Sequence, residues 1–312
     1  MRGVSRTNGI EIMRHLYRSI AWVAAFLFAG HGEQASGRDQ LSQRPILFDS
    51  DRTGRQEIYT LDPAGSGLPQ QLTSSAELNG SSSFASWSPD GQRIAFILTV
   101  DGNADIAMID ADGSNLRRLT THPAADLYPA WSPDGSQIAF GSSRDGNREI
   151  YVMNADGNDQ RNTTNHPAFD SRPSWSPDGS QILFGSDRGH VGDRPGPNLF
   201  LMHHDGSRLR QLTHHDRADM VARFSSDGRL IVFASNRAGG QQIYTMNPDG
   251  SAVRQLTFPP GTHGGPAWSP DVSWVVFHSE RDGNPEIYVM KADGSALRRL
   301  TFDPASDLHP SW

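Results

Sequence analysis

Apolar residues occur in short consecutive runs that are separated by polar turn sequences along most of the chain. Ile138-Ala-Phe140 and Ile150-Tyr-Val-Met153 are two such runs, and Arg144-Asp-Gly-Asn147 lies between them. Short apolar runs bounded by Gly, Asp and Asn are typical of strands that are buried on both faces. Asp-Gly pairs favour the tight turns of hairpins. The pattern therefore predicts an all-β protein built from short antiparallel strands.

The motif Trp-Ser-Pro-Asp-Gly recurs along the chain at a nearly constant spacing. Successive copies are 44, 44, 49, 44 and 44 residues apart, although the fourth copy begins with Phe and the last is a bare Trp. A repeat of this length predicts a β-propeller, in which each repeat forms one blade. The first residues of the copies are Trp87, Trp131, Trp175, Phe224, Trp268 and Trp312.

One repeat predicts four strands, at residues 129–131, 137–142, 149–154 and 160–164. The apolar core of the second strand occurs six times, so we expect a six-bladed propeller over residues 46–312 with four antiparallel strands per blade. The first blade has no first strand of its own. We expect the C-terminal residues His309-Pro-Ser-Trp312 to complete it, because this closure leaves no sheet edge exposed.

The N-terminal residues have the pattern of an export signal. Arg14 and Arg18 precede the apolar stretch 20–29, and small residues follow. This order predicts a secretory signal peptide with a short tail at 1–37, then a linker at 38–45. Cleavage would leave a periplasmic protein without stable membrane insertion; an uncleaved membrane anchor is the alternative.

Composition excludes several classes of function. The formal net charge is −7 and Lys291 is the only lysine, which argues against nucleic acid as a partner. The chain contains no cysteine, so it has no disulfide, thiol nucleophile or cysteine-ligated zinc. It also lacks the motifs of serine hydrolases, zinc peptidases and phosphate-binding loops. We therefore expect no catalytic residue that a linear motif would reveal.

Aspartate and arginine occur at matching places in the repeats. Asp126 stands five residues before its Trp, and Arg144 follows the next strand. The second blade has Ser82 and Val100 instead, and this joint loss predicts that the two residue types pair. The alternative is an acidic ring at the channel mouth that holds a cation or a basic peptide. The expected pairs are Asp307–Arg52, Asp126–Arg144, Asp170–Arg188 and Asp219–Arg237.

Positions that differ between blades are candidates for a binding surface. The sixth blade places Arg281 opposite His263 where the others have Asp, and the residue three before the Trp also varies. The fourth blade carries a Gly/Pro-rich insertion at 187–197, and we expect all these positions on one loop face. The repeated His122, His166 and His215 predict loop packing. The candidate binding residues are Tyr128, Arg172, His263, Arg281 and His309.

The repeats resemble the propeller of the TolB family of bacterial periplasmic proteins. The resemblance rests on the Pro-x-Trp-Ser-Pro-Asp-Gly, Glu-Ile-Tyr-Val-Met and Arg-Arg-Leu-Thr pieces and covers about residues 44–312. It implies a monomeric, non-enzymatic binding scaffold with a protein partner, an envelope lipoprotein, and it allows Ca²⁺ in the channel. The N-terminal α/β domain of that family has no counterpart in this sequence.

Similar repeats also occur in propellers attached to serine peptidases and in polysaccharide lyases. A second hypothesis is therefore a propeller-type enzyme in which His263, His309, Arg172 and Arg281 act on an acidic polysaccharide. A third hypothesis is a glycan-binding module.

Overall fold

A computed structural model describes residues 44–188 and 196–312. The predicted signal peptide, most of the predicted linker and the centre of the insertion at 187–197 lie outside these residues. Within the described part of the chain, no helix is long and apolar enough to cross a bilayer.

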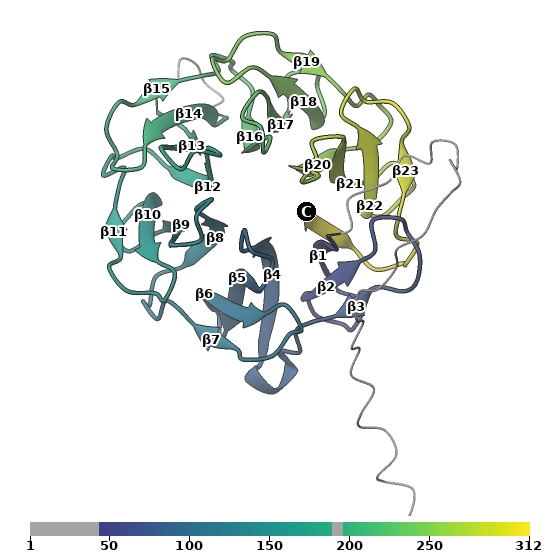
Figure 1. Ribbon diagram of the computed structural model, residues 1–312, viewed down its shortest axis with the longest axis horizontal. Helices are drawn as coiled ribbons and strands as arrows, with labels where there is room; N and C mark the ends of the chain where they lie inside the picture. Colours follow the sequence, from purple (N-terminus) through teal and green to yellow (C-terminus); the bar gives the residue numbers. More distant parts are fainter. Residues whose placement is uncertain (1–43, 189–195) are drawn as a thin grey trace, which may run out of the picture. The chain divides into compact units, whose positions relative to one another are not determined.

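The described residues form six four-stranded antiparallel sheets arranged in a ring, which confirms the predicted propeller (Figure 1). Blade 1 consists of β24 (Asp307–Ser311), β1 (Ile46–Ser50), β2 (Glu57–Leu61) and β3 (Gln70–Gln71). Blade 2 consists of β4 (Gly80–Trp87), β5 (Arg93–Val100), β6 (Asn103–Asp110) and β7 (Arg117–Arg118). Blade 3 consists of β8 (Asp126–Trp131), β9 (Gln137–Ser142), β10 (Glu149–Asn154) and β11 (Arg161–Asn162).

The remaining blades repeat this order from the centre of the ring outwards. Blade 4 consists of β12 (Asp170–Trp175), β13 (Gln181–Ser186), β14 (Asn198–His203) and β15 (Arg210–Gln211). Blade 5 consists of β16 (Asp219–Phe224), β17 (Ile231–Ser235), β18 (Gln242–Met246) and β19 (Arg254–Gln255). Blade 6 consists of β20 (His263–Trp268), β21 (Trp274–Ser279), β22 (Glu286–Lys291) and β23 (Arg298–Arg299). A short 3₁₀ helix, η1 (Ala76–Leu78), precedes β4.

The two middle strands of each blade are buried at nearly every position, as their consecutive apolar residues predict. The repeated Trp lies at the seam between blades. Trp131, from blade 3, packs against Ile106 and Met108 of blade 2. Trp175, from blade 4, packs in the same way against Val152 of blade 3. The Trp therefore recurs along the chain because each indole fills the seam between two neighbouring blades.

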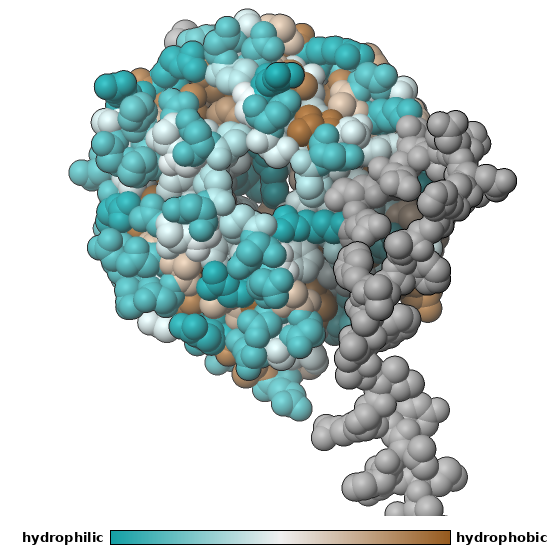
Figure 2. Space-filling view, in the orientation of Figure 1, coloured by the Kyte–Doolittle hydropathy of each residue, from teal (hydrophilic) through white to brown (hydrophobic). Residues whose placement is uncertain are grey.

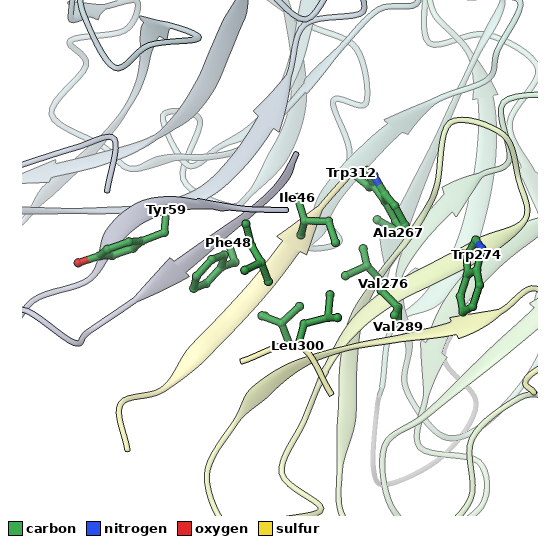
Figure 3. Packing of buried hydrophobic residues seen from close by; sticks show 11 residues of the cluster. Ile46, Phe48, Tyr59, Ala267, Trp274, Val276, Val289, Leu300 and Trp312 are labelled. Atoms are coloured by element: carbon green, nitrogen blue, oxygen red, sulfur yellow. The ribbon is translucent and has the colours of Figure 1, made fainter. Parts of the chain in front are cut away.

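The ring is closed by the last strand of the chain. β24 pairs with β1 in antiparallel register, with Leu47 opposite Ser311 and Ser50 opposite Asp307. At the seam with blade 6, Trp312 lies beside Ala267 and Ile46 in one buried cluster (Figure 3). The indole nitrogen of Trp312 donates a 2.8 Å hydrogen bond to the carbonyl of Arg44. This arrangement confirms the predicted closure.

Candidate functional site

The innermost strand of every blade has an irregularity at the same place. In β8 the register with β9 shifts between Leu127 and Ala130, which marks a β-bulge. The residue three before the Trp position has a positive φ in all six blades, which is uncommon for residues other than glycine. Because the bulge lies on the strand nearest the axis, it directs a variable side chain towards the centre of the ring. These residues are Phe84, Tyr128, Arg172, Val221, Gly265 and His309.

Four of these side chains meet at the centre, and we call Phe84, Tyr128, Arg172 and His309 the axial cluster. The ring of Phe84 stacks on His309 with 3.7 Å between centroids and meets Tyr128 edge-on at 4.7 Å. The guanidinium carbon of Arg172 lies 4.4 Å from the centroid of Tyr128 and 5.3 Å from that of Phe84. Residues from four different blades therefore contact one another across the axis.

His309 is held on its other side by a buried carboxylate. Its Nδ1 lies 3.2 Å from both carboxylate oxygens of Asp49, and the Oδ1 of Asp49 also accepts the backbone N–H of Phe84 at 3.2 Å. The Nδ1 of His278 lies 3.4 Å from the backbone nitrogen of His309. Burial, together with the nearby His309, His263 and Arg172, lowers the pKa of His278 to about 3. His278 is therefore neutral at physiological pH.

A cavity of about 210 Å³ opens beside the axial cluster, and we call it the pit. Phe84, Tyr128 and Arg172 line it together with residues at the ends of the innermost strands. The pit therefore lies towards the end of the innermost strands that is opposite to Asp126, the first residue of β8. Figure 2 shows that the ring is hollowed at its centre and that hydrophilic residues surround the hollow. The apolar walls of the pit come from Trp87, Trp131, Trp175, Pro89, Pro129, Pro133 and Pro173.

A second arginine, Arg223, lines the pit from blade 5. The residue before the Trp position is small in the other five blades, where it is Ser or Ala. The Nη1 of Arg223 donates to the Oγ of Ser311 at 3.4 Å. Burial lowers the pKa of Arg223 to about 10, and the positive charge of Arg172 contributes to this shift. Among the described residues, no carboxylate forms a hydrogen bond or an ion pair with Arg172 or Arg223.

The arginines at the opposite end of the strands have carboxylate partners. Arg52 donates to both oxygens of Asp307 at 2.8 Å, and Arg144 and Arg237 reach Asp126 and Asp219 at 2.9 and 2.8 Å. Arg188 pairs with Asp170 in the same way. All four carboxylates are fully buried, and the Nε of each arginine also donates to a serine hydroxyl. The four pairs predicted from the sequence are present, and they join the start of each innermost strand to the following loop.

Comparison with known proteins agrees with this architecture. Residues 69–159 and 127–193 match the family model PD40, described as the TolB beta propeller domain. A segment of 89 residues is 36% identical to the "Tol-Pal system protein TolB" of Anaeromyxobacter dehalogenans strain 2CP-C. The chain is a TolB-like β-propeller.

Solved structures extend the likeness of the TolB-like propeller over most of the chain, as a likeness of fold. TolB from Acinetobacter baumannii superposes with a TM-score of 0.76 and 22% identity over 86% of this chain and 66% of that one. An oligogalacturonate lyase from Vibrio parahaemolyticus superposes with a TM-score of 0.55 and 16% identity over 82% of this chain and 74% of that one. The segment matched to the A. dehalogenans protein is 28% of this chain and 19% of that relative.

The structure brings together three of the five predicted binding residues of the TolB-like propeller. Tyr128, Arg172 and His309 all belong to the axial cluster. His263 is fully buried, so its expected place on an exposed loop face is wrong. Arg281 lies at the opposite end of the strands, with its guanidinium carbon 5.9 Å from the ring centroid of Tyr288.

The three repeated histidines occupy equivalent places in their loops. The Nδ1 atoms of His122, His166 and His215 accept the backbone N–H two residues further on, at 3.0 to 3.1 Å. Within residues 44–188 and 196–312 there is no group of three or more His, Asp or Glu that could hold a metal ion. The paired aspartates already face arginines, so these residues do not fit the calcium ion that the family resemblance allows.

The sequence analysis missed four residues of the site: Phe84, Arg223, Asp49 and His278. Phe84 stands at the variable position before the Trp, and Arg223 is the single large residue at a position otherwise occupied by Ser or Ala. Asp49 and His278 directly follow the Phe of the second-strand core, at a position where the other blades have Ile, Gly or Ala. Comparing the repeats position by position would have identified Arg223, Asp49 and His278 as departures from the common pattern.

Proposed function

We propose that this TolB-like propeller is a non-enzymatic protein-binding scaffold of the bacterial cell envelope. The match to the TolB propeller model supports this proposal, as does the name of the relatives, which are Tol-Pal system proteins. The signal peptide predicted over residues 1–37 supports a periplasmic location. The partner that we propose is an envelope protein, and a lipoprotein fits the resemblance best.

The contrast between constant and variable positions supports a binding site at the axis. The seam tryptophans recur because they fill the seams between blades, and the Asp–Arg pairs recur because they stabilise individual blades. The residue at the bulge position differs in every blade, so it adds surface chemistry without altering the scaffold. We therefore assign the partner to the mouth of the pit, with Tyr128 and Arg172 as contacts.

Capture from envelope extract tests this assignment. We expect the tagged full-length protein to retain one envelope protein specifically after cross-linking and mass spectrometry. Pro133→Glu places a charge at the mouth of the pit, where Pro133 is exposed, and is expected to abolish retention. Leu116→Glu changes an exposed residue near the outermost strand β7 and is expected to retain the partner.

Two results would contradict the proposal. One is equal retention by both variants, which would place the partner elsewhere. The other is turnover of uronic-acid polymers, followed by absorbance, because that activity would make the propeller an enzyme. Saturable binding on a glycan array with no protein captured would favour the glycan-binding module.

A further inference from the structure

Two arginines line the pit in adjacent blades, and both interrupt the repeat. Arg172 occupies the bulge position of blade 4, and Arg223 replaces the Ser or Ala that the other blades have before the Trp. Both side chains line the same cavity, and the charge of Arg172 lowers the pKa of Arg223. Both arginines therefore contribute positive charge to one cavity.

No carboxylate of residues 44–188 or 196–312 compensates these two charges. Burial lowers the pKa of Arg172, and the charge of Arg148 adds to that shift. Burying a cation is unfavourable unless a counter-charge or hydrogen bonds compensate. Elsewhere in this ring, a buried aspartate compensates the positive charges of Arg52, Arg144 and Arg237. The pit thus has the charge and the hydrogen-bond donors for an anion.

The contacts of the two guanidinium groups also determine which of their N–H groups can reach a ligand. One face of Arg172 lies over the ring of Tyr128, which leaves the N–H groups at its edge available to a ligand. Arg223 is anchored by the hydroxyl of Ser311 through one nitrogen. Two arginines with free edges match the planar, bidentate geometry of a carboxylate.

We propose that the pit binds the C-terminal carboxylate of a partner protein between Arg172 and Arg223. This inference rests on the proposed function, since it names the part of the partner that enters the ring. Three tryptophans and four prolines form the walls, which suits an apolar side chain next to the carboxylate. A cavity of about 210 Å³ accommodates the end of a chain but not a folded segment.

The mouth of the pit argues against a polyanion as the ligand. The turns that follow the innermost strands carry aspartates whose pKa is lowered by serine hydroxyl and backbone hydrogen bonds, so they are ionised at neutral pH. A polyuronate would have to pass these negative charges, whereas neutral or basic residues that precede a chain terminus would be attracted to them. The aspartates are Asp90, Asp134 and Asp178.

Competition between free and amidated peptide ends tests the proposal. An N-acetylated tripeptide library with free C-terminal carboxylates is titrated into the full-length protein, and tryptophan fluorescence reports on Trp87, Trp131 and Trp175. The same library in amidated form is the comparison. We expect the free acids to bind about tenfold more tightly than the amides, as for a charge-assisted hydrogen-bonded pair. Equal affinity of the two libraries would overturn the proposal.

Variants separate a binding role from a structural one. Arg223→Gln and Arg172→Gln are expected to remove the preference for free acids, and Arg223→Lys to keep part of it. Arg117→Gln, which removes one charge from the exposed outer strand β7, is expected to leave the preference intact. Arg223→Gln should also leave the melting temperature unchanged or raised, because an uncompensated charge is removed. A marked loss of stability with an unchanged preference for free acids would assign Arg223 a structural role and overturn the proposal.

The remaining outcomes distinguish this inference from the proposed function. If acetate or benzoate binds as tightly as the tripeptide acids, the ligand is a small carboxylate and the assignment to a chain end is wrong. If Arg223→Gln still captures the envelope partner in full, the scaffold function stands and the role of the pit is wrong. If no partner is captured while the preference for free acids persists, the proposed function is wrong and the pit binds another chain end.

Discussion

At the scale of single residues, the arginines divide into those with carboxylate partners and those without. Four of them form pairs at one end of the strands, in which each buried carboxylate faces a guanidinium. A buried pair of this kind is costly to break because one charge is then left alone. Arg172 and Arg223 instead share a cavity with each other. The same residue type therefore stabilises individual blades at one end of the strands and provides the proposed anion site at the other.

The depressed pKa of His278 predicts a pH-dependent stability. The folded protein keeps this side chain neutral down to about pH 3, whereas in the unfolded chain it takes up a proton near pH 6.5. Below pH 6.5 the unfolded state therefore binds more protons, and stability falls as the pH is lowered. The slope is at most about 1.4 kcal/mol per pH unit.

The variant His278→Asn is expected to flatten this dependence between pH 6.5 and 5 in chemical denaturation. Substitution of the exposed His214 by Asn is the matched control, and it should leave the slope as in the natural protein. The groups that face His278 are His309, His263 and Arg172. An unchanged slope in His278→Asn would show that one of these groups, and not His278, governs the dependence.

At the scale of elements, the bulged innermost strand provides the site. Left-handed backbone is unfavourable for residues with a Cβ, and it is especially so for β-branched ones. Val221 has this conformation with φ 52°. At the equivalent Gly265 of blade 6, a Cβ would come within 3.0 Å of the Nδ1 of His278, so the glycine there also leaves space for the neighbouring ring. The bulge is present in all six blades, and in every blade except blade 6 it carries a side chain at the axis.

The strain at the bulge predicts an unusual response to glycine. Val221→Gly should cost little or no stability, because relief of the left-handed conformation, about 1–2 kcal/mol, offsets the lost side chain. Val276→Gly is the control, since Val276 is fully buried in the regular strand β21. We expect that variant to lose several-fold more stability in denaturant titrations. Similar losses in both variants would mean that the bulge carries no strain.

At the scale of the whole ring, closure joins residues that are far apart in sequence. β24 supplies the innermost strand of blade 1, and Trp312 fills the seam with blade 6 (Figure 3). Every other seam lies between sheets that are consecutive along the chain. The final strand is therefore what makes six neighbouring sheets into a ring without an exposed edge.

Weakening the closure is expected to destabilise the ring. Trp312→Ala should lower the free energy of unfolding by about 3–5 kcal/mol, the usual cost of removing a buried aromatic side chain. Deletion of residues 307–312 should cost more, because the strand pairing with β1 is lost as well. Trp87→Ala, at a less buried indole, is expected to have a smaller effect in thermal unfolding. Unchanged unfolding after the deletion would show that the C-terminal strand does not close the ring.

Within single blades, the sequence predicted the structure well because equivalent positions of the repeats can be compared with one another. Blade 2 lacks the Asp and the Arg together, and that joint loss identified pairs that the structure forms in four other blades. The same reasoning placed Tyr128, Arg172 and His309 at variable positions. It placed His263 wrongly on the surface, because the sequence does not reveal that β20 is buried along its whole length.

The sequence by itself determined the number of blades, their strands and the closure, because apolar periodicity and turn residues are local signals repeated six times. Only the tertiary structure decided which side chains meet at the axis. The positive φ at each bulge turns Phe84, Tyr128, Arg172 and His309 inward from four blades. Arg223 reaches the same cavity from a different position of its repeat. Contacts across the axis depend on the curvature and packing of the whole ring, and no stretch of the chain encodes these alone.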